Sequence, residues 1–142
     1  MQNHLDCYQK VKKKCFNFIT SQETKKEKFK NKEKMIKSFL IPICFWINKN
    51  KPQKKTFIIG LAGGQGTGKT TISSLIRLIL VTYFKLNVFK VSIDDFYKTR
   101  KERLKLSKSK HHILLTRGGP GTQEVDMLNK LFRNVKNSKF KS

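Results

Sequence analysis

GGQGTGKT at residues 63–70 matches the pattern G-x-x-x-x-G-K-[ST]. An apolar, β-prone run at residues 57–62 precedes it, and apolar residues then recur at three- and four-residue steps from Ile72 to Tyr83. A buried strand, a glycine-rich loop and an amphipathic helix in this order are what a phosphate-binding loop requires. The stretch therefore predicts nucleotide binding, and the alternative is a glycine-rich turn that binds nothing.

Each residue type in this loop has a physical role. Glycine permits positive φ angles and lets the backbone approach a ligand closely. Successive N–H groups and the positive end of the following helix then attract a polyphosphate. Lys69 is predicted to reach the outer phosphates, and the hydroxyl of Thr70 to hold Mg²⁺.

A second signal follows the next apolar run. Residues 88–93 are predicted to form a strand, so that residues 57–93 make one βαβ unit with a parallel sheet. Asp94 and Asp95 come directly after this run, at the end of the sheet where α/β proteins bind ligands. A carboxylate there can accept the proton of an attacking hydroxyl. The alternative is a pair of exposed turn acids or a helix cap.

Helical segments are predicted on both sides of this unit. A surface helix over about residues 5–20 precedes a Lys-rich connector, and a second helix covers residues 35–48 with Pro42 at its first turn or at a kink. A basic helix is expected over residues 98–110, and Thr122 is expected to cap a last helix that reaches Phe132. The glycine-rich stretch around Arg117 is by itself a weak signal, for which an ordinary turn is the simpler interpretation.

The composition favours a cytoplasmic protein. The chain has 142 residues, with 32 Lys and Arg against 9 Asp and Glu, for a formal net charge of +23. This charge is spread evenly rather than clustered with aromatic residues, so we expect no specific nucleic-acid partner. Its three cysteines form no C-x-x-C pair, which favours a reducing compartment. No apolar stretch is long enough to span a bilayer, and we expect no membrane partner.

Three ordered motifs carry a family resemblance. GLAGGQGTGKTT at 60–71, SIDDFYKT at 92–99 and TRGGPGT at 116–122 together resemble the P-loop kinases of the D-glycerate 3-kinase type, which are relatives of uridine kinase, pantothenate kinase and phosphoribulokinase. The resemblance runs from about Phe39 to Phe132. It implies an ATP-dependent small-molecule kinase that transfers the γ-phosphoryl of Mg-ATP to a substrate hydroxyl, such as that of a small hydroxy acid.

The resemblance also implies a fold and a set of site residues. The fold would be an incomplete α/β, P-loop NTPase-like parallel sheet flanked by helices. Asp94 and Lys69 match catalytic positions, Asp95, Tyr97 and Arg117 match the region that binds the acceptor, and Arg117 would pair with a carboxylate. The nucleotide and its Mg²⁺ would be held by Gly63, Gly64, Gln65, Gly66, Thr67, Gly68, Lys69, Thr70 and Thr71, with Thr70 as the metal ligand.

The chain also departs from the family pattern. Gln123 and Glu124 follow Pro-Gly-Thr where the family usually has His-Asp, and the family's later strand ending in Glu-Gly-Trp has no counterpart. We expect a Lys-rich helical or partly disordered N-terminal extension at residues 1–37, followed by the N-terminal half of a kinase domain at 38–142. A complementary C-terminal fragment is a candidate partner. The alternative functions are a truncated, catalytically deficient nucleotide-binding remnant and, with less support, a basic nucleic-acid-associating protein.

Overall fold

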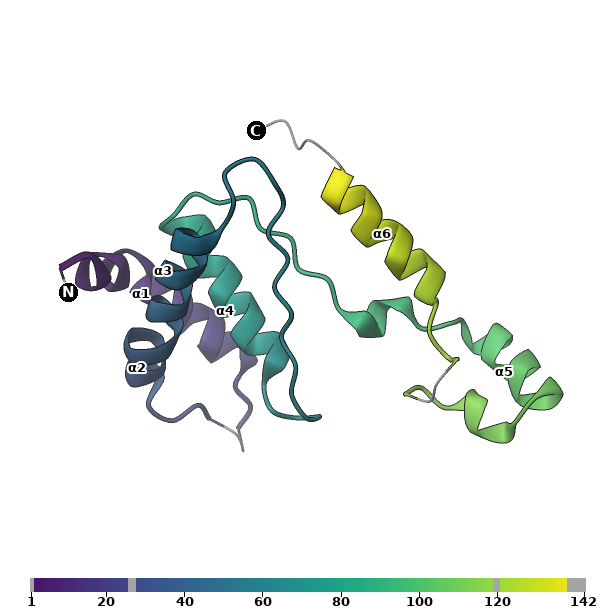
Figure 1. Ribbon diagram of the computed structural model, residues 1–142. Coiled ribbons are helices and arrows are strands. Elements are labelled where there is room, and N and C mark those ends of the chain that lie inside the picture. The colour runs from purple at the N-terminus through teal and green to yellow at the C-terminus, as the bar shows by residue number, and fades with distance from the viewer. Residues whose placement is uncertain (1, 26–27, 119–120, 138–142) are drawn as a thin grey trace. The chain divides into compact units, whose positions relative to one another are not determined.

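A computed structural model describes residues 2–25, 28–118 and 121–137 of the chain (Figure 1). The described residues form α-helices joined by short π- and 3₁₀-helical segments and by loops. In chain order these elements are α1 (Gln2–Gln22), α2 (Lys32–Met35), the π-helical η1 (Ile36–Leu40), α3 (Ile41–Asn50), α4 (Lys69–Thr82), the 3₁₀-helical η2 (Ile93–Phe96), α5 (Arg100–Ser109), the 3₁₀-helical η3 (His112–Leu115) and α6 (Val125–Asn137).

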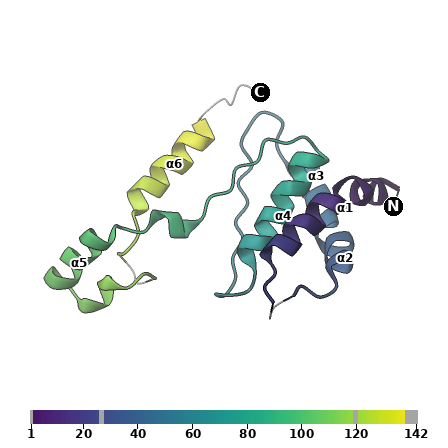
Figure 2. The same cartoon turned by 180° about the vertical axis from the view of Figure 1, so that it is seen from behind.

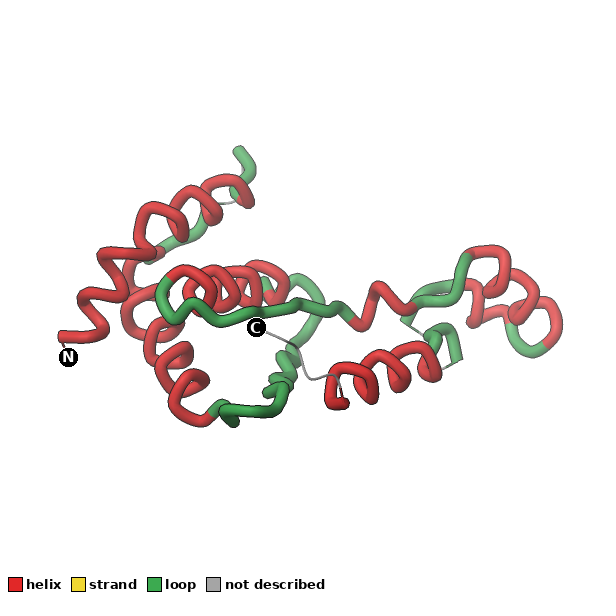
Figure 3. The backbone as a smooth tube through the Cα atoms, turned by 90° about the horizontal axis from the view of Figure 1, so that it is seen from above, coloured by secondary structure: helices red, strands yellow, loops and turns green. Residues whose placement is uncertain are grey.

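The predicted parallel sheet is wrong. Across the described residues no strand is present, and the β-pairing consists of one isolated antiparallel bridge between Tyr97 and Gln123. Figure 3 accordingly shows helices and loops without a strand. An apolar, β-branched run shows only that a segment favours extended backbone and burial. A strand also needs a neighbour that pairs with its N–H and C=O groups.

The two apolar runs lack that neighbour in this structure. Residues 57–62 and 88–92 have no regular secondary structure and join no ladder. Their side chains are correspondingly open, with Phe57 37%, Leu61 48% and Val91 46% exposed. The expected α/β architecture is therefore replaced by a helical one.

The chain folds as two compact units. Unit 1 comprises the residues up to 53 together with 57–90, and unit 2 comprises 54–56 together with the residues from 91 onward. Each unit is described by itself below. The predicted division of the chain at residue 37 stays a prediction.

Unit 1 is built around the contact between α1 and α4 (Figures 1 and 2). Cys7, Val11, Cys15 and Ile19 recur every four residues on one face of α1, and all four are fully buried. On α4 the buried residues are Leu75, Ile79 and Leu80. The helix predicted for residues 5–20 is confirmed, and its apolar face forms part of the core.

The helical segment from α2 to α3 completes this core. Its buried residues are Ile36, Leu40, Ile41, Cys44 and Ile47. Pro42 is the second residue of α3, and the π-helical η1 ends two residues before it, at Leu40. Proline donates no hydrogen bond and displaces the carbonyl four residues earlier, so a wider turn at this point accommodates it. The prediction of a helix with Pro42 at its first turn or at a kink is confirmed.

Aromatic residues of α3 are divided between the core and the surface. Phe45 packs against the rings of Tyr83 and Phe84, with ring centroids 5.8 and 4.9 Å away. Trp46, which is the one tryptophan of the sequence, is 58% exposed, and its ring lies 6.5 Å from that of Phe57. Aromatic content alone therefore did not indicate which ring is buried.

The predicted helix over 98–110 is confirmed as α5. The capping prediction is wrong, because α6 begins at Val125 and the N–H of Leu128 donates to the carbonyl of Glu124. Thr122 is instead fully buried, and its carbonyl accepts from the N–H of Lys98. Among the described residues, no helix is both long and apolar enough to cross a membrane.

The three cysteines of unit 1 are buried free thiols. Burial raises the pKa of Cys7 from its ordinary value of 9.0 to about 11. Burial likewise raises the pKa of Cys15 and of Cys44 to about 12. Because the thiolate is the reactive form, these groups are both shielded and protonated at neutral pH.

We predict that the thiols of the native protein react slowly with 5,5′-dithiobis(2-nitrobenzoate) at pH 8. In guanidinium chloride all three should react rapidly, because unfolding removes both the shielding and the pKa shift. Absorbance at 412 nm measures both reactions. Rapid modification of the native chain would contradict the packing of α1 against α4.

Candidate functional site

The glycine-rich loop leads directly into α4. Gly66 and Gly68 have positive φ angles of 76° and 79°, which disfavour any residue with a side chain. Gly68 is the residue before the first turn of α4, and no side chain caps this helix end. The prediction that glycines in this loop allow positive φ angles therefore agrees with the structure at Gly66 and Gly68.

Lys69 folds back over the loop that precedes it. Its ammonium group donates to the carbonyl of Gly63 at 2.6 Å and also to that of Gly64. The hydroxyl of Thr67 donates to the same Gly64 carbonyl at 2.8 Å. A Cβ atom at Gly63 would lie 3.1 Å from the Thr67 hydroxyl oxygen, so the missing side chain leaves room for this closed arrangement. A cation is consequently held beside the loop backbone.

The first turn of α4 is favourable for an anion. It contains no acidic residue, and the hydroxyls of Ser73 and Ser74 donate to the Thr70 carbonyl at 3.0 and 2.8 Å. The unpaired N–H groups at a helix start and the helix dipole both favour negative charge. Gln65 and Thr70 are exposed and Thr71 is half-buried, so this end of the helix is accessible to a ligand.

A magnesium ion fits this end of α4 only together with phosphate oxygens. In the parts of the chain that the structure describes, no three His, Cys, Asp or Glu residues gather as a metal site. Mg²⁺ in nucleotide sites takes one or two protein ligands and completes its shell with phosphates and water. The exposed Thr70 hydroxyl is suited to be such a ligand.

In unit 2 the two adjacent acids have different environments. Ser92 directly precedes η2 and caps it, and its hydroxyl accepts the N–H of Asp94 at 3.2 Å. The carboxylate of Asp95 reaches back to accept the N–H of Ser92 at 3.3 Å, which completes a capping box. The carboxylate of Asp94 is exposed and makes no such bond within the described residues. The alternative that these acids cap a helix therefore applies to Asp95. The carboxylate of Asp94 takes no part in the cap and is accessible to a ligand.

A short backbone pairing joins the segment after η2 to the segment before α6. Lys98 donates its N–H to the Thr122 carbonyl at 2.8 Å, and Glu124 donates its N–H to the Phe96 carbonyl at 2.7 Å. The Lys98 ammonium also contacts the Glu124 carboxylate at 2.6 Å. Glu124, a departure from the family pattern, is thus an ion-pair partner in this structure.

Tyr97 and Arg117 lie together in unit 2. The guanidinium carbon of Arg117 is 5.8 Å from the centre of the Tyr97 ring, a cation–π distance. Tyr97 is half-buried and Arg117 is exposed, so the ring supports the guanidinium while leaving it open to solvent. Two predicted acceptor-binding residues are therefore neighbours.

Arg103 holds this arrangement together and was missed by sequence reasoning. It is only 8% exposed, and it donates to the carbonyl of Lys98 at 3.1 Å and to that of Leu115 at 2.5 Å. It thereby fixes the backbone next to Tyr97 and the backbone two residues before Arg117. In the sequence it lies in a run of basic residues and carries no signal that separates it from its exposed neighbours.

The predicted site residues thus fall into two groups. The nucleotide-binding residues, from Gly63 to Thr71, lie in unit 1, and Asp94, Asp95, Tyr97 and Arg117 lie in unit 2. The predicted roles of all these residues stay predictions.

Comparison with known proteins identifies one informative relative. The chain is 40% identical over 81 residues, 56% of its length, to the "Uncharacterized kinase mug58" of Schizosaccharomyces pombe. The matched region spans 29% of that protein's own length. No protein-family model matches the chain, and no solved structure matches it. The chain is therefore similar to part of a protein described as a kinase.

We predict that Arg103→Ala lowers the free energy of unfolding by about 2–5 kcal/mol, because it leaves two carbonyls without their donor. Urea unfolding followed by circular dichroism measures the change. Arg100→Ala, at an exposed position on the same helix, is the matched control and should change stability by less than about 0.5 kcal/mol. Equal effects of the two substitutions would contradict the structural role of Arg103.

Proposed function

We propose that this protein is an ATP-dependent small-molecule kinase that transfers the γ-phosphoryl group of Mg-ATP to a hydroxyl of a small hydroxy acid, as a glycerate kinase does. The observation that carries the proposal is the Lys69 ammonium, held against the loop carbonyls of Gly63 and Gly64 at the uncapped start of α4. The kinase relative supports the same class of reaction.

In this proposal the loop binds the triphosphate of ATP. Backbone N–H groups between Gly63 and Thr71 surround the phosphates, and Lys69 exchanges its carbonyl partners for phosphate oxygens. An anionic partner satisfies an ammonium group better than two neutral carbonyls do, since charge-assisted hydrogen bonds are about twice as strong. The closed loop of the free protein therefore holds its cation ready for the ligand.

Magnesium supplies charge neutralisation between the outer phosphates. Thr70 would provide one ligand through its hydroxyl, and the phosphates and water would provide the others. Thr71, one residue further along the first turn, adds a half-buried hydroxyl and an N–H group at the same helix end.

Asp94 is the proposed base. The acceptor hydroxyl gives its proton to the Asp94 carboxylate as its oxygen forms a bond to the γ-phosphorus. The bond between the γ-phosphorus and the bridging oxygen breaks, and ADP leaves with that electron pair. Asp94 suits this role better than Asp95, because only Asp95 uses its carboxylate to cap η2.

Arg117 is the proposed anchor of the acceptor. A guanidinium binds a carboxylate through two parallel hydrogen bonds, which selects hydroxy acids over neutral alcohols. The Tyr97 ring under the guanidinium limits its motion, and the tyrosine hydroxyl adds a hydrogen-bonding group. Asp95 contributes by fixing the turn on which Asp94 lies.

The composition of the chain supports a proposal for its compartment and its partners. We place the protein in the cytoplasm, with ATP and the hydroxy acid as its ligands and without a specific nucleic-acid or membrane partner. A complementary protein fragment is a further candidate partner, for which the exposed apolar side chains of residues 57–61 are the proposed contact.

We predict that Lys69→Ala weakens ATP binding by about 10- to 100-fold, because it removes a charged donor to the phosphates. Isothermal titration calorimetry with Mg-ATP measures the loss. Lys49→Ala, at an exposed position on α3, is the matched control for net charge and should bind as the wild type does. Equal affinities of wild type and Lys69→Ala would exclude the phosphate-loop assignment.

We predict that Asp94→Asn lowers the rate of ADP formation with D-glycerate by about 10²- to 10⁴-fold while ATP affinity is unchanged. Asp95→Asn is the matched comparison. It should retain more activity but lose up to about 1 kcal/mol of stability, because its side chain is a cap. A coupled assay for ADP and thermal unfolding provide the two readouts. Tight ATP binding without acceptor-dependent ADP formation would support the catalytically deficient alternative.

A further inference from the structure

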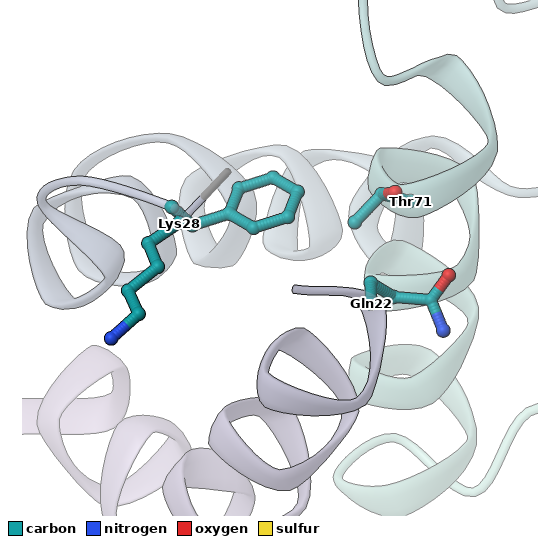
Figure 4. Close-up of a pocket in the computed structure, with 4 residues that line it drawn as sticks. Gln22, Lys28 and Thr71 are labelled. Atoms are coloured by element: carbon teal, nitrogen blue, oxygen red, sulfur yellow. The ribbon is translucent and has the colours of Figure 1, made fainter. Parts of the chain in front are cut away.

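A pocket of about 360 Å³ opens beside the start of α4 in unit 1 (Figure 4). Its lining residues come from three places: Gln22 ends α1, Lys28 and Phe29 belong to the connector between α1 and α2, and Thr71 is in the first turn of α4. Figure 4 shows Gln22 and Thr71 on one side of the opening and Lys28 on the other. We call this the connector pocket.

The connector pocket lies next to the phosphate loop. Thr71 is two residues after Lys69 on the same helix, so the two are separated by about 3 Å along its axis. A ligand whose phosphates occupy the loop would therefore have its remaining part within reach of the pocket.

Within the described part of the connector, Glu23 is bonded to Phe29 and Lys32. One carboxylate oxygen of Glu23 accepts the N–H of Phe29 at 2.7 Å, and the other contacts the Lys32 ammonium at 2.8 Å. The hydrogen bond from Lys32 holds the pKa of Glu23 below its ordinary value, so Glu23 stays ionised at neutral pH. Phe29, half-buried, is thereby fixed as a wall of the pocket rather than carried on a loose loop.

We propose that the connector pocket binds the adenine base of the nucleotide, an assignment that rests on the phosphate-loop function proposed above. An aromatic ring offers a stacking surface for a base. The Gln22 amide has both a donor and an acceptor, as the N6 amino group and N7 of adenine require. The Lys28 ammonium lies on the other side of the opening from Thr71 and adds positive charge to that wall.

Size and chemistry both favour a base over the acceptor. The volume is at the lower end of the range for small-molecule sites, which suits one part of a larger ligand. None of the lining residues is acidic, so the pocket offers no group to take the proton of an acceptor hydroxyl. The residues proposed for the acceptor all lie in unit 2.

The test compares ATP with inorganic tripolyphosphate, which keeps the phosphates but lacks the base and sugar. Phe29→Ala should weaken ATP binding by about 5- to 100-fold, in line with the effect of removing a stacking ring. It should leave the affinity for tripolyphosphate unchanged. Phe29→Leu keeps apolar volume without an aromatic face and should show the same separation if the alanine variant folds poorly. Titration calorimetry at fixed Mg²⁺ measures each affinity.

Two further variants sharpen the assignment. Phe39→Ala removes a ring that is 57% exposed elsewhere in unit 1 and should bind both ligands normally. Gln22→Ala should reduce the preference for ATP over GTP, since guanine presents two acceptors where adenine presents a donor and an acceptor.

The outcomes separate this inference from the proposed function. If the wild type binds neither ATP nor tripolyphosphate, the phosphate-loop function fails and the base site fails with it. If ATP and tripolyphosphate bind equally well and the Phe29 variants change neither, the base site is wrong while the loop function stands. Equal weakening of both ligands by both Phe29 variants would also overturn the base site, because it would show an indirect effect on the loop.

Discussion

The burial of one face of α1 against α4 is the contact on which unit 1 depends. Cys7, Val11, Cys15 and Ile19 form a stripe that excludes water from Leu75 and Ile79. Burying a side chain of isoleucine size contributes about 1.5–3 kcal/mol, so this stripe is a large part of the stability of a small unit. The same contact sets the position of α4, whose first turn begins at Lys69. It also brings the end of α1 beside that turn, where Gln22 and Thr71 line one pocket.

Unit 2 is held by different means. Its interior contains a charged side chain, Arg103, and a polar one, Thr122, whose neighbours are backbone carbonyls and turns. Hydrogen bonds of this kind are directional, and losing one partner leaves a buried group unsatisfied. Such a frame orders the backbone of unit 2 while the side chains of Asp94 and Arg117 stay exposed and that of Tyr97 stays half-buried.

The sequence predicted the features that depend on local chemistry. The glycine pattern predicted the loop, and Gly66 and Gly68 have the positive φ angles that only glycine adopts easily. Helices were also predicted where α1 and α5 lie, although the period-four apolar face of α1 and the capping box between Thr99 and Glu102 at the start of α5 were recognised only in the structure. These signals involve residues at most four positions apart, so the chain around them determines the outcome.

Features that depend on distant partners were not predictable in the same way. The runs 57–62 and 88–92 have strand-like composition, yet pairing requires a neighbouring chain, and composition does not specify one. Arg103 resembles any residue of a basic helix until the carbonyls of Lys98 and Leu115 lie beside it. The unequal environments of Asp94 and Asp95 likewise follow from the position of the Ser92 N–H group.

The position of Trp46 gives the molecule a built-in reporter. It is the sole tryptophan of the sequence and belongs to unit 1, whereas Tyr97 belongs to unit 2. Intrinsic tryptophan fluorescence therefore follows the melting of one unit and is blind to the other, while far-ultraviolet ellipticity records both. A mismatch between the two signals on heating would reveal that the units lose their structure separately.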